Sequence, residues 1–394
     1  MNRLYILDPV CALSYGHNIN ALHYFREFFV QQGLDVHTFA SRLLPEALTQ
    51  GNIEREFTFL YGDVINVEPL LTSGERDLLR SIHGHNDKLA LATGEMRAFL
   101  DAFRLTSDDA VFFPSVDFYG LMGILRALSA VDPARAPKLY LRFIGVMERT
   151  APGFPEPRAR LLDELRRYLR GRPDSVRISA ETPRLAAILA EELAVPAIAT
   201  PYPLTGDALP METEGPLVIL AAGAARLDKG YLRLRQIYQH LTEEVGLGKF
   251  EFLIQSAPDE LVHQTSDYSR ELFRLAHVNI LPSVLSHEAM VDCYRRCHVV
   301  AMPYAADVYA ERGSAVMQEA AAAGRYVVGQ RGTGFASQIV SFGIGLVANT
   351  ELDFANQLGR IVSLPRERLA ELALEGRDRY AEEARRSYEN WLAA

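Results

Sequence analysis

The first half of the chain alternates short apolar runs with longer segments in which apolar residues recur at helical spacing. RLYILD (3–8) and LDVHTFA (34–40) predict strands, and INALHYFREFFVQQG (19–33) between them predicts an amphipathic helix. A strand, a helix and a second strand within about 40 residues form a βαβ unit, whose strands pair in parallel. The same alternation predicts further strands at 110–115, 137–145 and 175–180, with helices at 117–128 and 181–194.

The segment ATPYPLTGDALPMETEGP (199–216) interrupts this pattern with proline, threonine, glycine and acidic residues, which are typical of a linker. The alternation then resumes, with predicted strands at 217–225, 250–256, 278–283, 298–304 and 325–330, helices at 231–245 and 287–297, and a final helix at 366–394. A chain of 394 residues is long for one hydrophobic core. We therefore expect two α/β domains with parallel sheets, over 1–205 and 206–371.

Composition narrows the class of protein. The net charge of −9 argues against a nucleic-acid partner. Cys11, Cys293 and Cys297 are too few for a disulfide framework, which favours a reducing compartment. Cys293, Cys297 and His298 have a spacing that a metal site could use, although small apolar residues on a helix face are the simpler interpretation. Because no apolar run reaches about 18 residues, we expect a cytoplasmic protein, soluble or peripheral on the inner face of a membrane.

Two loops carry candidate chemistry. Arg226 and Lys229 follow a predicted strand directly, and two cations there suit a diphosphate, although a solvated surface pair is an alternative. In ERGSAVMQEAAAAG (311–324), Gly313 and Ser314 predict a helix start, because serine caps helices and glycine permits close approach. The free N–H groups of such a start attract anions. A phosphate is therefore expected at this helix start.

Glu311 and Glu319 flank this helix start with seven residues between them. Glu319 lies about 7 Å along the helix axis from the start, which suits contacts to different parts of one extended ligand. A carboxylate accepts two hydrogen bonds from a vicinal diol such as that of ribose. The alternative is an ordinary exposed helical glutamate.

The order of these features resembles the retaining glycosyltransferases of GT-B architecture that use nucleotide-sugar donors, the E-x7-E or family 4 (group 1) type. The segment PYAADVYAERGSAVMQEAAAAGRYVVGQRGTGF carries the resemblance, which is good over 215–345 and only architectural over the first 200 residues. It implies two Rossmann-like domains whose parallel sheets face each other across a cleft. It also implies a donor site in the C-terminal domain and a terminal helix (372–394) that crosses back to the first domain.

The resemblance also implies roles for individual residues. Glu319 would bind the donor ribose, Glu311 would face the donor sugar, and Arg226 with Lys229 would hold the diphosphate. The backbone of Gly313, Ser314 and Ala315 would add to that grip, and Val284 would lie against the base. The sequence departs from the family in four places. Only two residues separate Arg226 from Lys229, and the glycine after Glu311 comes one place early. The glycine turn reads Gly-Thr-Gly, and Gln338 stands where an acidic residue is common.

In the first domain, the loop SYGHN (14–18) takes the place of the family's glycine-rich loop. Gly16 would let the backbone approach the donor phosphate, and His17 would act at the reacting centre, although a plain turn before a helix is an alternative. Arg142 stands where many relatives carry a strand-end histidine. Asp117, His83 and His85 are further candidates.

The helix at 155–173 combines a leucine stripe with surrounding arginines. It is a candidate for contact with anionic lipid, and packing on its own domain is the alternative. No Asp-x-Asp pair occurs in the sequence, which favours metal-independent transfer and no cofactor besides the donor.

The sequence therefore predicts transfer of a sugar from a UDP- or GDP-sugar to a hydroxyl of a glycan or lipid-linked acceptor, with retention, in polysaccharide or glycoconjugate assembly. The alternatives are a non-catalytic nucleotide-sugar-binding subunit and another GT-B enzyme, such as an epimerase or a phosphorylase.

Overall fold

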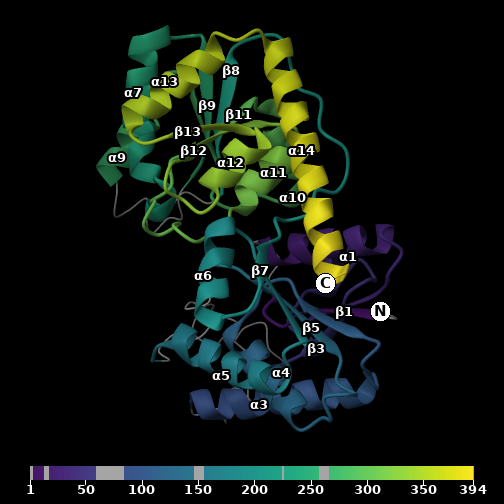
Figure 1. Ribbon diagram of the computed structural model, residues 1–394. Coiled ribbons are helices and arrows are strands. Elements are labelled where there is room, and N and C mark those ends of the chain that lie inside the picture. Colours follow the sequence, from purple (N-terminus) through teal and green to yellow (C-terminus); the bar gives the residue numbers. More distant parts are fainter. Residues whose placement is uncertain are drawn as a thin grey trace. The chain divides into compact units, whose positions relative to one another are not determined.

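The computed structural model describes residues 3–12, 17–58, 84–145, 155–223, 226–256 and 266–393. The chain divides into two compact units (Figure 1). Unit 1 comprises Met1–Pro203 and Ser387–Ala394, and unit 2 comprises Leu204–Arg386. Each unit is an α/β layer structure built on its own parallel sheet, as the strand-helix alternation predicts.

The sheet of unit 1 has the strand order β3-β2-β1-β4-β5-β6-β7, and its pairs are parallel. Strands β2 and β3 follow on one side of β1. The chain then returns to place β4 on the other side of β1, and β5, β6 and β7 follow on that side. The topological switch point therefore lies between β1 and β4. The strands are β1 (Arg3–Asp8), β2 (Asp35–Ser41), β3 (Glu54–Phe57), β4 (Ala110–Phe113), β5 (Lys138–Phe143), β6 (Val176–Ala180) and β7 (Ala197–Ala199).

Helices cover both faces of this sheet, so its strands are apolar on both sides. Along β1, Tyr5 and Leu7 face one hydrophobic core, whereas Leu4 and Ile6 face the other. The first core contains α3 (His85–Ala102), α4 (Phe118–Ser129), α5 (Pro157–Gly171) and α6 (Pro183–Leu193), and the second contains α1 (His17–Gln31).

Unit 2 repeats the arrangement with the order β10-β9-β8-β11-β12-β13, again with parallel pairs. Its switch point lies between β8 and β11. The strands are β8 (Leu217–Ala221), β9 (Phe250–Gln255), β10 (Val278–Leu281), β11 (Val299–Met302), β12 (Tyr326–Gln330) and β13 (Gly345–Ala348). One face packs against α7 (Leu234–Val245), α9 (Ser266–Leu272) and α13 (Glu351–Val362), and the other against α10 (His287–Arg296), α11 (Ala315–Ala322) and α12 (Ala336–Phe342).

The terminal helix α14 (Arg366–Ala393), yellow in Figure 1, contributes side chains to more than one core. Leu369 and Tyr380 belong to the two cores of unit 2, and the Tyr380 ring stacks on Phe342 with centroids 4.7 Å apart. Tyr388 and Trp391 belong to the second core of unit 1. The last residues of this helix, from Ser387, are therefore part of unit 1.

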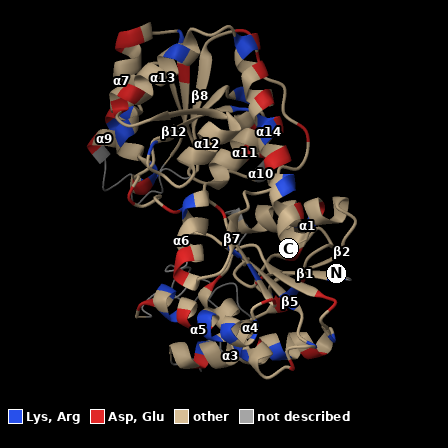
Figure 2. Cartoon of the chain, viewed as in Figure 1, with Lys and Arg blue, Asp and Glu red and all other residues tan. Residues whose placement is uncertain are grey.

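The leucine stripe predicted on α5 is buried. Leu161, Leu162, Leu165 and Leu169 all lie in the first core of unit 1. Arginines of this helix contact acidic neighbours: Arg166 pairs with Asp163 at 2.6 Å and Arg167 with Glu164 at 2.6 Å. Basic residues follow one another along α5, with acidic residues among them (Figure 2). The proposed membrane contact through 155–173 thus has no support, because its apolar face is covered by the protein. In the described part of the chain, no helix has the length and apolarity that a membrane crossing requires.

The three cysteines are buried as free thiols, and burial raises the pKa of each. For Cys297 the pKa rises to about 12. His298 uses both ring nitrogens within the fold: Nδ1 accepts from the Val218 N–H at 2.9 Å and Nε2 donates to the Glu212 carbonyl at 2.9 Å. Among the described residues, no group of three His, Cys, Asp or Glu side chains could hold a metal ion. Cys293 and Cys297 both belong to a hydrophobic core of unit 2.

Candidate functional site

Most of the predicted donor-site residues of unit 2 lie in or after the loops on the two sides of its topological switch point. Arg226 and Lys229 lie in the loop after β8, and Glu311 lies in the loop after β11, which leads into α11. Open parallel sheets bind ligands beyond the carboxyl ends of their strands at such a point. The two loops are joined directly, because the Ala305 N–H donates to the Asp228 carbonyl at 2.8 Å.

The loop after β8 turns at Gly223, which has φ +91°. Its N–H donates to Gln255 Oε1 at 2.6 Å, and its carbonyl accepts from Lys229 Nζ. A Cβ added at Gly223 would lie 2.9 Å from Cγ2 of Val316, in the first turn of α11. Glycine is needed here both for the backbone conformation and for the close approach to α11.

Arg226 is engaged in a polar cluster. Its Nε and Nη2 each donate to a different oxygen of Asp228 at 3.0 Å, and Nη2 also donates to the Tyr309 hydroxyl at 2.9 Å. This bidentate pair fixes the guanidinium plane beside the loop after β11. The sequence prediction assigned Arg226 to the diphosphate without its Asp228 partner.

Lys229 lies where folding disfavours its charged form. Burial and the nearby charge of Arg226 lower its pKa from 10.5 to about 8, while the negative charges of Asp228 and Glu319 oppose that shift. Its Nζ lies 5.8 Å from the ring centroid of Tyr304. Lys229 and Glu319 therefore share one electrostatic environment, as a ligand that contacts both would require. An anionic ligand at this position would restore the preference of Lys229 for its charged form.

The helix after Glu311 starts where the sequence predicts. Ser314 is the N-cap of α11, and its hydroxyl accepts from the Met317 N–H at 3.3 Å. Gly313 precedes the cap and Ala315 is the first helical residue. The first turn of α11 lies beside Gly223, whose carbonyl accepts from Lys229 Nζ, so the helix dipole and the ammonium would favour the same anion.

The two glutamates have different surroundings. Glu319 is half-buried on α11, and its Oε2 accepts from the hydroxyl of Tyr294, a buried residue of α10, at 2.9 Å. Glu311 is half-buried in the preceding loop. The Gly334 N–H donates to the Tyr309 carbonyl at 2.7 Å, and a Cβ at Gly334 would lie 2.8 Å from the Glu311 carbonyl carbon. The glycine turn after β12 thus fixes the main chain at Glu311.

Val284, the predicted base contact, follows β10 and is 71% exposed. The adjacent Ser283 carbonyl accepts from Gln255 Nε2 at 2.8 Å. Gln255 therefore links the loop after β10 to the loop after β8. Neither this link nor Tyr294 was predicted from the sequence.

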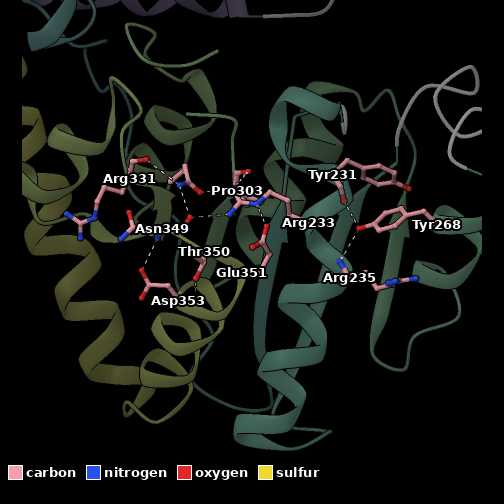
Figure 3. Close-up of polar contacts among 11 residues, drawn as sticks. Tyr231, Arg233, Arg235, Tyr268, Pro303, Arg331, Asn349, Thr350, Glu351 and Asp353 are labelled. Carbon is pink, nitrogen blue, oxygen red and sulfur yellow. Dashed lines mark hydrogen bonds and ion pairs between the residues drawn. The ribbon is translucent and has the colours of Figure 1, made fainter. Parts of the chain in front are cut away.

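Arg233 ties the ends of three strands together (Figure 3). Its Nε donates to Glu351 Oε1 at 2.5 Å, and Nη1 donates to the Pro303 carbonyl at 3.0 Å and to Gln330 Oε1 at 2.6 Å. Nearby, the Tyr268 hydroxyl accepts from the Arg235 backbone N–H at 3.0 Å (Figure 3). This N–H lies in the first turn of α7 and has no hydrogen-bond partner within the helix. These contacts hold the loops that carry the site.

The N-terminal candidates are less completely described. Gly16 and His83 lie outside the described residues, and His17 begins α1 without a described side chain. Asp117 caps α4 by accepting from the Gly120 N–H at 2.5 Å. Asp8 is buried at the end of β1, and burial followed by the charge of Asp117 raises its pKa to about 8.

Arg142 lies in the interior of unit 1 and is fully buried. Its Nε donates to the Thr200 carbonyl at 2.9 Å and its Nη1 to the Pro114 carbonyl at 3.0 Å. The guanidinium carbon lies 4.1 Å from the ring centroid of Tyr202. Arg142 thus holds the main chain where the linker begins. His85, another candidate, contacts the Tyr119 hydroxyl through Nδ1.

Several solved structures are similar to this chain. No family model matches the sequence, and no curated protein matches it. A UDP-forming α,α-trehalose-phosphate synthase from Burkholderia xenovorans has a TM-score of 0.63 at 14% identity, with 100% of this chain and 99% of that chain covered. A sucrose-phosphate synthase from Thermosynechococcus elongatus has a TM-score of 0.64 at 14% identity, with 99% of each chain covered.

A third structure, described as trehalose-6-phosphate from E. coli bound with UDP-2-fluoro glucose, has a TM-score of 0.65 at 12% identity, with 98% of each chain covered. The similarity extends over essentially the whole of each chain. Together with the two parallel sheets, it shows that the fold is GT-B, as the sequence resemblance implies.

Proposed function

We propose that this protein is a glycosyltransferase that moves a sugar from a nucleotide diphosphate sugar to a hydroxyl acceptor, with retention of anomeric configuration. The observation that carries the proposal is the meeting of Lys229, the first turn of α11 and Glu319 at the switch point of unit 2. A cation and free amides suit a diphosphate, and a carboxylate further along the same helix suits a ribose diol.

In this proposal the chemistry is electrostatic. As the bond to the anomeric carbon breaks, negative charge grows on the leaving diphosphate. Lys229 and the amides of Gly313, Ser314 and Ala315 stabilise that charge without reorganising. Asp228 and Tyr309 hold the Arg226 guanidinium in one orientation, and its positive charge adds to this stabilisation. Glu311 contacts the sugar, and Val284 lies against the base.

The neighbouring structures support a nucleotide-sugar donor. One of them is described as UDP-forming and another as bound with UDP-2-fluoro glucose. We propose UDP or GDP as the nucleotide, a glycan or lipid-linked hydroxyl as acceptor, metal-independent transfer, and a role in polysaccharide or glycoconjugate assembly. We assign His17 to the reacting centre and Gly16 to the donor phosphate.

A thermal-shift screen with UDP, GDP, ADP and their sugar conjugates tests the donor site, first with EDTA and then with Mg²⁺. Ligand at 100 times its Kd stabilises the folded state by about 2.7 kcal/mol. One of these nucleotides should raise the melting temperature of the wild type. Glu319→Ala should weaken the binding of that nucleotide by roughly tenfold to a hundredfold, because a charged hydrogen-bond acceptor is lost. Glu375→Ala, at an exposed glutamate of α14, is the matched control.

Turnover is then measured with the selected nucleotide sugar and a panel of glycan and lipid-linked acceptors. Release of nucleoside diphosphate that depends on the acceptor, with the product anomer assigned by NMR, supports retaining transfer. Donor binding without turnover would favour a binding subunit. Release driven by inorganic phosphate would favour a phosphorylase, and sugar conversion without any acceptor would favour an epimerase.

A further inference from the structure

Glu319 is held from outside its own helix. Tyr294, on α10, donates its hydroxyl to Oε2 of Glu319 at 2.9 Å, across a sequence separation of 25 residues. Tyr294 is 4% exposed, so its hydroxyl has little access to water. A hydrogen bond from a fixed donor removes rotamer freedom from a half-buried carboxylate.

Tyr294 is itself anchored. Its carbonyl accepts from Nε of Arg325 at 2.6 Å, and Arg325 is fully buried, with Nη2 donating to the Pro210 carbonyl at 2.7 Å. Burial, together with the negative charge of Glu319, raises the pKa of Tyr294 well above 10. The hydroxyl therefore stays protonated and remains a donor at every working pH.

We propose that Tyr294 is a positioning residue for nucleotide recognition: it fixes the Glu319 carboxylate in the orientation that accepts both hydroxyls of a ribose diol. This inference rests on the proposed function. A carboxylate can accept about four hydrogen bonds, so one from Tyr294 is compatible with two more from a diol. Tyr294 does not contact the ligand in this scheme and acts only through Glu319.

The test compares Tyr294→Phe with Tyr238→Phe, which removes another buried hydroxyl that donates to a backbone carbonyl, that of Ala276, at 2.7 Å in the same unit. Isothermal titration with UDP, GDP and ADP identifies the nucleotide that the wild type binds most tightly. Its Kd is then measured for each variant, alongside the Kd of its 2′,3′-dideoxy form. A purely structural role would weaken both ligands equally, whereas a positioning role weakens only the ligand that has the diol.

We expect Tyr294→Phe to raise the Kd of the ribonucleotide about fivefold and to leave that of the dideoxy form unchanged. Tyr238→Phe should change neither. Equal Kd values for Tyr294→Phe and the wild type, or equal losses for both ligands, would overturn the inference. If Glu319→Ala also has no effect, or the wild type binds none of the three nucleotides, the proposed function fails as well. The two failures are therefore distinguishable.

Tyr294→Phe leaves a carboxylate facing an apolar ring, which threatens folding. The double variant Tyr294→Phe/Glu319→Ala removes that charge and provides a second test. If Tyr294 acts only through the Glu319 carboxylate, the double variant binds the nucleotide as Glu319→Ala does alone, because no acceptor is left for Tyr294 to orient. A further loss in the double variant relative to Glu319→Ala would contradict the inference.

Discussion

The lowered pKa of Lys229 makes donor affinity depend on pH. If only the ammonium form binds the diphosphate, the apparent Kd is multiplied by 1 + 10^(pH − pKa). With the pKa at about 8, this factor is ~1.1 at pH 7 and ~11 at pH 9. The nucleotide sugar should therefore bind about tenfold more weakly at pH 9 than at pH 7.

Isothermal titration between pH 6.5 and 9.5 measures this effect, with the nucleotide sugar that gives the largest thermal shift. Lys229→Arg is the matched control, because a guanidinium keeps its charge over the whole range. Titration of the base cancels when the two profiles are compared. Above pH 8, wild-type binding should take up a proton, which is detected by repeating the titration in buffers of different ionisation enthalpy. Identical pH profiles for the wild type and Lys229→Arg would refute the reasoning.

The ligand-free protein should respond in the opposite direction. Because folding lowers the pKa of Lys229 from 10.5 to about 8, the unfolded chain binds more protons than the folded chain between these values. Stability attributable to Lys229 therefore rises with pH across that window, while donor affinity falls. Chemical denaturation of the wild type and Lys229→Arg at pH 8 and pH 10 separates the two trends. A wild-type gain that is no larger than that of Lys229→Arg would contradict this assignment.

Two further predictions concern stability. Gly230→Ala should destabilise unit 2 by more than ~2 kcal/mol, because φ is +77° and the added Cβ would lie 2.0 Å from the Pro303 carbonyl oxygen. Gly246→Ala has a similar φ of +82° with no atom within 4 Å, so the difference between the two variants in denaturant unfolding isolates the clash. Arg233→Met should cost about 2–4 kcal/mol, because three acceptors lose their donor. Arg235→Met, which loses a more exposed ion pair, should cost under ~1 kcal/mol, and equal losses for the two arginine variants would contradict the role given to Arg233.

Much of the fold follows from local pattern. The apolar runs that predict strands correspond to buried strands in both sheets, and the start of α11 follows from Gly313 and Ser314. The edge strand β3 was missed because its sequence EREF is mostly polar and three of its four residues are not buried. β7 has only three residues, none of them buried, and gives no pattern either.

The sequence names candidate residues but not their partners. Lys229 is a candidate because it follows a strand, and Glu319 because it lies on the helix that begins after Glu311. Partners that lie far apart in the sequence leave no such signal: Arg233 meets Gln330 across 97 positions and Glu351 across 118. The burial of the Arg142 side chain was also hard to predict. Because β5 is buried on both faces, alternation along its sequence does not distinguish a solvent-facing side chain from a buried one.

The rate at which the buried cysteines are alkylated reports how often the structure around them opens. Burial raises the pKa of all three thiols and shields them from reagents, so alkylation requires the surrounding structure to open. Cys11 lies in unit 1, whereas Cys293 and Cys297 lie in unit 2. Pulse alkylation of the unmodified chain, followed by peptide mass spectrometry, would therefore time the opening of each unit in one sample. A ligand confined to unit 2 would slow the labelling of Cys293 and Cys297 and leave the labelling of Cys11 as its internal reference.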